Sequence, residues 1–297
     1  MSIRLDPNLL PSLLASIQQS EQNQSVSTQQ LASGRTVNQL SDDPAAAAAL
    51  VQNHNQSGAD AQFLQSLSTL QSRYQVADSA LGNVVTALTQ AVSIGTEGAN
   101  GTLNDSDRQA IAGEVQGLIN QTVSLANTTY QGSYLFAGTK TTTQPFTLDS
   151  STNAVTYNGN SATTSVELSN GVSIGANVPG DQLFQNASGN VTSALTDLYN
   201  ALTSGNNIPS SVTEVQSALN QVSQQRVFYG NALDQINQSE SFLNQDQLNL
   251  SEQENTLVGA NLATVASQFA QAQVANQATL NATAKVLSLP NLLDYIK

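Results

Sequence analysis

The sequence predicts a mainly α-helical protein. Long helices from the two ends of the chain would pair into an antiparallel coiled-coil or helical-bundle rod, with a small β-rich insert between them. Three observations predict this. Apolar residues recur every seven positions in one segment of each half, and helical spacing stops between residues 139 and 190. The composition, 39% hydrophobic and 10% charged over 297 residues, suits a thin core spread along long elements.

The longest periodic segment lies in the second half of the chain. One heptad position is apolar throughout, and its members are Val215, Val222, Tyr229, Ile236, Leu243, Leu250 and Leu257. The row three residues ahead of it turns polar after Leu233, at Glu240, Gln247 and Glu254. A sustained spacing of three and four residues predicts a helix packed along a seam, here from Ser211 to Leu257.

A matching helix is predicted in the first half, from Ala45 to Ala91. Its two apolar rows are Leu67, Tyr74, Leu81 and Leu88, and Phe63, Leu70, Ala77, Val84 and Ala91. A break is expected at Gly95, Gly98 and Gly101. Asp105 and Asp107 then suit the cap and first turn of a third helix. A calcium loop would need a bidentate Glu farther along, and none follows at that spacing.

The middle segment reads as short strands joined by turns. Val155-Thr156-Tyr157 runs into Asn158-Gly159, and Val166-Glu167-Leu168 runs into Asn170-Gly171 before Val172. Asn-Gly between short β-prone segments is a strong hairpin signal, so we expect a hairpin at each. The predicted β-rich outer insert covers residues 139–190.

The outermost segments have weaker seams. Gln24 and Ser27 occupy seam positions between apolar residues, and the heptad register slips by one residue at Gly259. Ordering a residue costs roughly 1–2 kcal/mol, more than these faces repay in a lone chain. We therefore expect residues 1–43 and 259–297 to form a terminal assembly domain that is disordered in the monomer. Residues 44–138 and 191–258 would form the helical rod domain.

The chemistry of the chain points away from catalysis. His54 is the sole histidine and there is no cysteine, so neither a nucleophile–base pair nor a zinc ligand set can form. We predict no catalytic, cofactor-binding or metal-binding residues, and no small-molecule substrate. The net charge of −13 argues against a nucleic-acid partner. The start of the sequence lacks a cationic and apolar leader, and no apolar run is long enough to span a membrane.

Several phrases resemble one family. Residues 31–47, LASGRTVNQLSDDPAAA, resemble the N-terminal signature of the bacterial flagellin superfamily, and the Pro after two Asp is typical of its hook-associated branch. Residues 132–139, GSYLFAGT, are similar to the entry to the β insert of the hook-associated protein 3 family, and Leu292 to Ile296 are similar to its tail. The motif residues are Gly34, Arg35, Asp42, Asp43, Pro44, Tyr134, Phe136, Gly138, Arg226 and Gly230.

The resemblance implies a structural subunit of the hook–filament junction. It implies self-association in a ring, contacts with another hook-associated protein and with flagellin, and export by the flagellar type III apparatus with a chaperone. The location would be extracellular, in the flagellum, without a cleaved signal peptide. The expected assembly interface comprises Leu10, Leu13, Ile17, Leu31, Leu262, Val265, Phe269, Leu280, Leu287, Leu292 and Leu293. Filament flagellin is one alternative, and a secreted coiled-coil interaction protein is a weaker one.

Overall fold

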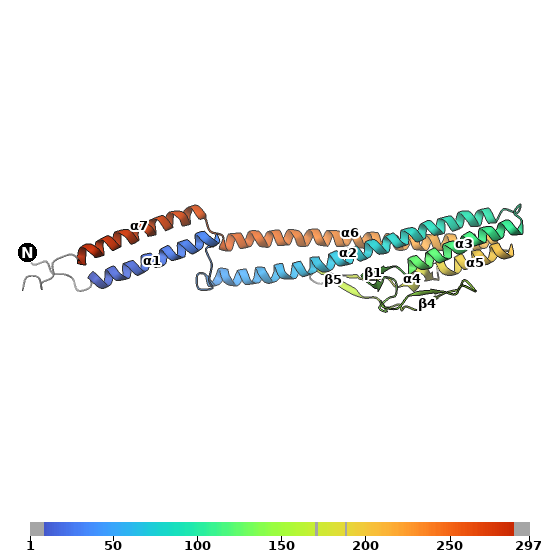
Figure 1. The fold of residues 1–297 in the computed structure, drawn as a ribbon, viewed down its shortest axis with the longest axis horizontal. Coiled ribbons are helices and arrows are strands. Elements are labelled where there is room, and N and C mark those ends of the chain that lie inside the picture. The colour runs from blue at the N-terminus through green and yellow to red at the C-terminus, as the bar shows by residue number, and fades with distance from the viewer. Residues whose placement is uncertain (1–8, 170–171, 188, 288–297) are drawn as a thin grey trace, which may run out of the picture. The chain divides into compact units, whose positions relative to one another are not determined.

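The structure is a computed structural model that describes residues 9–169, 172–187 and 189–287. Its helices are α1 (Leu9–Ser33), α2 (Pro44–Gly98), α3 (Asp105–Ala126), α4 (Gly180–Phe184), α5 (Val191–Ser204), α6 (Ile208–Val258) and α7 (Leu262–Leu287). Its strands are β1 (Thr129–Tyr130), β2 (Ser133–Tyr134), β3 (Phe146–Leu148), β4 (Val155–Tyr157), β5 (Ser165–Ser169), β6 (Val172–Gly175), β7 (Gln185–Asn186) and β8 (Gly189–Asn190). The prediction of a mainly helical chain with a small β insert is confirmed (Figure 1).

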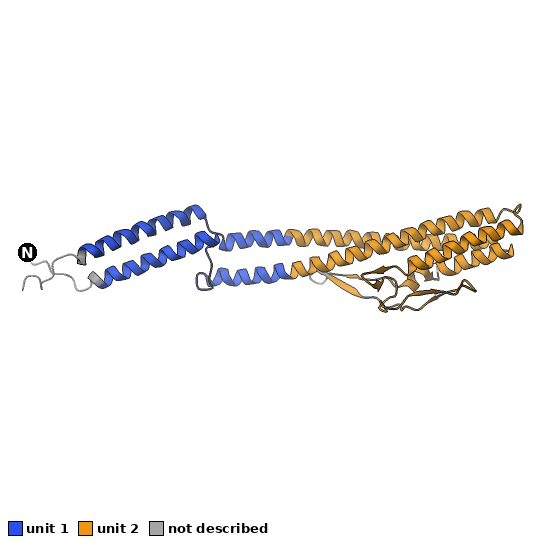
Figure 2. Ribbon diagram, in the orientation of Figure 1, with its two compact units in different colours: residues 1–58, 246–297 blue, residues 59–245 orange. Residues whose placement is uncertain are grey.

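The chain divides into two compact units, coloured separately in Figure 2. Unit 1 contains residues 1–58 and 246–297, and unit 2 contains residues 59–245. The long helices α2 and α6 each contribute residues to both units. Each unit therefore draws on both halves of the sequence.

In unit 2, α2 and α6 pack along the two predicted heptad stripes. The rings of Tyr74 and Tyr229 meet edge to face, with centroids 5.1 Å apart. Arg226 of α6 donates two hydrogen bonds to the carboxylate of Asp78 in α2, at 2.9 and 3.1 Å. The main α6 stripe is buried from Val215 to Leu243, as predicted, whereas its last two predicted members, Leu250 and Leu257, are half-buried.

The second buried row of α6 differs from the predicted one. We expected the row three residues ahead of the main stripe, which includes Leu219 and Leu233. Instead, Ala218 and Ala232, three residues after it, are buried, while Leu219 and Leu233 are half-buried. The second buried row of α6 thus contains alanines in place of the larger leucines that were expected.

The glycines after the α2 stripe do not break the helix where expected. α2 continues through Gly95 to Gly98. A Cβ at Gly95 would lie 2.7 Å from a methyl group of Val212, and one at Gly98 would lie 2.2 Å from a methyl group of Leu202. Both glycines therefore provide room for neighbouring helices. The following helix α3 is capped by Asn104, whose side chain accepts from the amide of Asp107, so the prediction of Asp105 as the cap is wrong.

The β insert consists of four two-stranded antiparallel sheets within the described residues. β5 pairs with β6 around residues 170–171, which lie outside the described residues, and this confirms one predicted hairpin. The prediction of a hairpin turn at Asn158-Gly159 is wrong. Strand β4 pairs instead with β3, the strand that precedes it in the sequence. After β4 the chain crosses residues 136–139, where Asn160 exchanges hydrogen bonds with Thr139.

The insert is held together by four aromatic rings. Phe184 contacts Phe136 edge to face with centroids 5.5 Å apart, and Phe146 in the same way at 5.2 Å. Phe146 also contacts Tyr157. The three Phe side chains are fully buried. They join a loop, strand β3 and helix α4 into one core.

Stability should fall at alkaline pH because two buried phenols must remain neutral. Burial raises the pKa of Tyr74 to about 12 and raises that of Tyr229 still further. In the unfolded chain a Tyr titrates near 10. The stabilisation is thus complete below pH ~10 and is lost as the pH rises through about 12, at a cost of about 2–3 kcal/mol per phenol. Thermal unfolding between pH 9 and 12 measures this loss.

Two variants separate the buried phenols from general alkaline effects. Tyr229→Phe removes a fully buried hydroxyl and should flatten the pH dependence. Tyr199→Phe, at a partly exposed position of α5, should leave it as in the wild type. Equal slopes for the two variants would contradict this explanation.

Candidate functional site: a loop junction and the terminal helix pair

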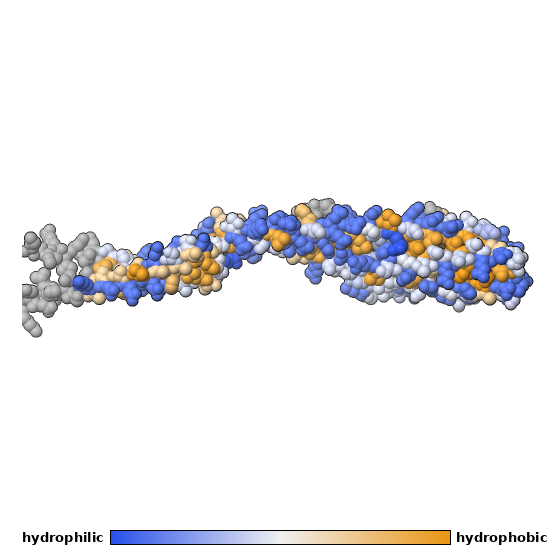
Figure 3. Space-filling view, turned by 90° about the horizontal axis from the view of Figure 1, so that it is seen from above, coloured by the Kyte–Doolittle hydropathy of each residue, from blue (hydrophilic) through white to orange (hydrophobic). Residues whose placement is uncertain are grey.

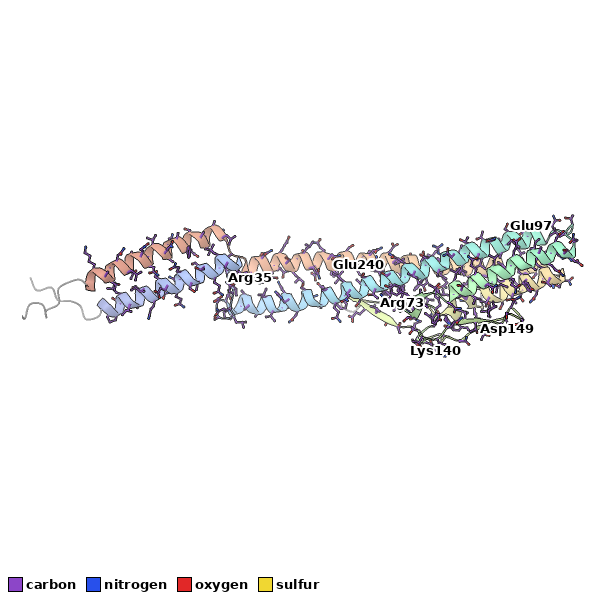
Figure 4. The ribbon with its side chains drawn as sticks, in the orientation of Figure 1. Arg35, Arg73, Glu97, Lys140, Asp149 and Glu240 are labelled. Atoms are coloured by element: carbon purple, nitrogen blue, oxygen red, sulfur yellow. The ribbon has the colours of Figure 1, made fainter. Side chains whose placement is uncertain are left out.

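Two loops of unit 1 bring most of the N-terminal motif to one place. The first, residues 34–43, joins α1 to α2, and the second, residues 259–261, joins α6 to α7. Gly34 ends α1 in the left-handed conformation, with φ of 70°, and its amide donates to the carbonyl of Gln30 at 2.9 Å. Glycine suits this position because other L-residues are strained there. Figure 4 labels Arg35 where these loops meet.

The two aspartates of the motif build the first loop and start α2. Asp42 accepts hydrogen bonds from the amides of Asn38 and Gln39, both at 2.9 Å. Asp43 accepts from the amides of Ala45 and Ala46 at 2.9 and 3.0 Å. The bonds to Asp43 satisfy amides that lack partners at a helix start, and Pro44 suits the same place because it has no N–H. The prediction of a helix start at this phrase is confirmed.

The two loops are hydrogen-bonded to each other through their backbones. The amide of Thr36 donates to the carbonyl of Val258 at 2.7 Å, and the amide of Ala260 donates to the carbonyl of Gly34 at 2.9 Å. Arg35 and Gly259 face each other as an isolated antiparallel bridge. A Cβ at Gly259 would lie 2.3 Å from the carbonyl oxygen of Asn255, so a side chain cannot be accommodated without movement. We call this loop pair the junction.

An ionic contact reinforces the junction. The guanidinium of Arg35 pairs with the carboxylate of Glu254, whose second oxygen lies 3.6 Å from Nε2 of His54. The sequence suggested that Glu254 weakens the α6 seam, whereas the structure gives it two cationic or potentially cationic neighbours. The side chains of Arg35 and Glu254 are 37% and 32% exposed, so the pair contributes on the order of 0.2–1 kcal/mol.

Helices α1 and α7 pack on each other beside the junction. The buried or half-buried residues of α1 recur with heptad spacing: Leu13, Ile17, Ser20, Gln24, Ser27 and Leu31. Those of α7 do the same: Val265, Phe269, Ala272, Asn276, Thr279 and Thr283. The hydroxyl of Ser20 donates to the carbonyl of Ala272 at 3.1 Å. The seam is real but half polar, which agrees with the weak seam expected from Gln24 and Ser27.

The expected interface residues fall into three groups. Leu13, Ile17, Leu31, Val265 and Phe269 lie on the α1–α7 seam, where Val265 is 4% exposed. Leu262 and Leu280 point away from it and are 53% and 51% exposed. Leu10 and Leu287 lie in α1 and α7, and Leu292 and Leu293 lie outside the described residues. Their role in assembly remains a prediction.

A groove runs along the α1–α7 pair. It has a volume of about 900 Å³ and is lined by small and polar side chains of both helices. Leu14 and Val274, which are 57% and 70% exposed, also lie on this pair. Apolar side chains on the face shown in Figure 3 otherwise lie in small patches among hydrophilic ones. The terminal pair thus keeps both a groove and exposed aliphatic side chains for contact.

The other motif residues lie in unit 2 and have structural surroundings. Phe136 belongs to the aromatic core, and Tyr134 lies in β2. Gly138 has a φ of 69°, and a Cβ there would lie 2.1 Å from Asn160. Arg226 binds Asp78, and Gly230 has open space around it on α6. The motif therefore forms no single site: part of it builds the junction and part holds unit 2.

The described residues contain no group of three or more His, Cys, Asp and Glu side chains arranged to bind a metal. No described helix has the length and apolar content needed to cross a bilayer. Sequence reasoning missed Glu254, Thr36 and Ser20, which make the contacts above. The available sequence signal for Glu254 was its charged side chain in a row that is mostly apolar up to Leu233.

The chain is similar in sequence to known flagellar proteins. The family model for the bacterial flagellin N-terminal helical region matches residues 9–141. Flagellar hook-associated protein 3 of Escherichia coli K12 is 37% identical over 119 residues, which are 40% of this chain and 38% of that protein. Its counterpart in Salmonella typhimurium LT2 is 34% identical over the same length. Each match thus spans less than two fifths of the relative's own length.

Solved structures share the fold. A putative flagellar hook-associated protein from Vibrio parahaemolyticus superimposes with a TM-score of 0.67 at 22% identity, covering 73% of this chain and 100% of that one. FlgL of Xanthomonas campestris gives a TM-score of 0.60 at 19% identity, covering 67% and 98%. At these identities the likeness concerns the fold alone.

Proposed function

We propose that this chain, whose residues 9–141 match the family model for the bacterial flagellin N-terminal helical region, is a structural, non-catalytic subunit of the flagellum that joins the hook to the filament. The observation that carries the proposal is the junction between the two loops of unit 1. The N-terminal motif residues 34, 35, 42, 43 and 44 build this loop pair, which positions both terminal helices together. The identity to two hook-associated proteins, rather than to a filament protein, supports the choice within the superfamily.

Assembly would use the terminal helices. Because their seam is half polar, the α1–α7 pair gains little from its own packing. Its groove and its exposed aliphatic residues, such as Leu262 and Val274, are available to neighbouring copies. We propose that copies associate in a ring and that burial by neighbours completes the order of residues 1–43 and 259–297. Flagellin and another hook-associated protein would contact the ring from either side.

Delivery would be by the flagellar type III apparatus, with an export chaperone. A chain without cysteine has no disulfide to prevent threading in an extended state. The weak terminal seam also lowers the work of unfolding before transport. The final location would be outside the cell, at the hook–filament junction.

Deleting the gene in its own bacterium tests the function. We expect cells that keep their hooks, lack filaments and release flagellin monomers into the medium, as seen by electron microscopy and by blotting of the supernatant. Complementation with the intact gene should restore filaments. Hookless cells would contradict the proposal. Complete filaments attached to their hooks would contradict it as well, and would favour the alternative of a filament or secreted coiled-coil protein.

A further inference from the structure

The seam between α1 and α7 specifies the alignment of the two helices only weakly. A hydrogen bond from a side chain of this seam to a backbone atom runs from Ser20 to the carbonyl of Ala272. Every residue of a helix carries such a carbonyl, so this bond would form equally well after a shift by one heptad. The side-chain bond from Asn276 to Gln24 is 3.5 Å long, at the limit of a hydrogen bond. Neither contact selects one alignment.

Apolar packing does not select it along the whole pair either. The larger apolar seam residues of α7, Val265 and Phe269, lie near its start. Beyond Ala272 the seam residues are Asn276, Thr279 and Thr283. In coiled coils the register is set by complementary apolar side chains or by a buried polar pair with good geometry. Over the outer half of this seam, the apolar residues Leu13 and Ile17 of α1 have no large apolar counterpart among the half-buried residues of α7.

The junction, in contrast, permits one alignment only. The amides of Thr36 and Ala260 donate to the carbonyls of Val258 and Gly34, which places the end of α1 against the start of α7. In addition, the side chain of Arg35 in the first loop pairs with the side chain of Glu254 in α6. Gly259 cannot be displaced by another residue of this loop without a clash at Asn255. A shift of the first loop by one residue would separate Arg35 from Glu254 and would place a residue with a side chain opposite Arg35 in place of Gly259.

From this contrast we infer that the junction sets the register of α1 against α7, with the Arg35–Glu254 pair as a latch that keeps the loops together. Holding two chain segments at one point also raises their effective concentration for pairing. The terminal helices then pair in one alignment even though their seam would accept several. The inference concerns the helices to which the proposed function assigns assembly, but its test needs no flagellum.

Cross-linking within the free chain measures the register, and the absence of native cysteine makes the readout clean. The double variant Ser20→Cys Ala272→Cys reports the observed alignment. Ser20→Cys Thr279→Cys reports an alignment shifted by one heptad. With a short thiol cross-linker, we expect at least about tenfold more product from the first pair than from the second.

Opening the latch should lower this selectivity. Glu254→Gln removes the ionic contact and should reduce the ratio of the two products about two- to fivefold, as expected for an exposed pair. Adding Thr36→Pro removes one backbone donor and should bring the ratio close to one. Glu252→Gln is the matched control, because Glu252 is exposed two residues away and the substitution removes the same charge. It should leave the ratio unchanged.

Three results would overturn the inference. They are equal products from the two cysteine pairs in the otherwise native chain, an unchanged ratio in the combined variant, and an equal effect of the two Gln substitutions. Any of these would leave the proposed function intact, since hook attachment in cells is a separate measurement. Conversely, hookless cells or complete filaments in the deletion strain would rule out the proposed function without altering the cross-linking ratio.

Discussion

Replacing Phe184 by alanine is expected to lower the free energy of unfolding of unit 2 by about 3–5 kcal/mol. The side chain is fully buried and contacts the rings of both Phe136 and Phe146. Its removal would lose the transfer free energy of a large apolar group and leave a cavity between helix α4, strand β3 and the loop that contains Phe136.

The matched control is Phe242→Ala in the same unit. That side chain is 63% exposed on α6, so its removal should change the free energy of unfolding by less than about 0.5 kcal/mol. Urea unfolding followed by tyrosine fluorescence measures both variants, since the chain has no Trp to dominate the signal. If both variants lost the same stability, the aromatic cluster would not be the core of the insert.

The helices could be predicted from the sequence because their information is local and repeated. The α6 stripe has one member every seven residues, and the predicted Ser211–Leu257 helix differs from the observed Ile208–Val258 by a few residues. Leu67, Tyr74, Leu81 and Leu88 were predicted as one buried row and all four are buried. In a two-helix seam the same spacing sets both the helix and its packed face.

The β insert was harder to predict because its pairing depends on distant residues. The Asn158-Gly159 step has the composition of a hairpin turn, but β4 had already paired with β3 through the loop of residues 149–154. That loop is closed by Asp149, which accepts hydrogen bonds from Ser151. These two bonds lower the pKa of the Asp149 carboxyl below its ordinary value. A choice between two plausible turns is decided by tertiary contacts.

For the candidate site, the sequence identified one side of the junction and not the other. Asp42, Asp43 and Pro44 act within a few residues of themselves, so their helix-start role was readable. The partners of Gly34, Arg35 and Thr36 lie more than two hundred residues away, at Ala260, Glu254 and Val258 respectively. Periodicity cannot pair segments that distant. The register slip at Gly259 indicated a change in the helix there, and the structure ends α6 at Val258.

The central claim is that the terminal helix pair is the least stable part of the chain and is completed by neighbouring subunits. Limited proteolysis of the dilute monomer tests it most directly, with assembled hook–filament junctions digested in parallel. In the monomer we expect cleavage to remove residues before about Ser41 and after about Gly259, leaving a resistant middle, while the same sites are protected in the assembly. Full protection of both ends in the dilute monomer would contradict the claim.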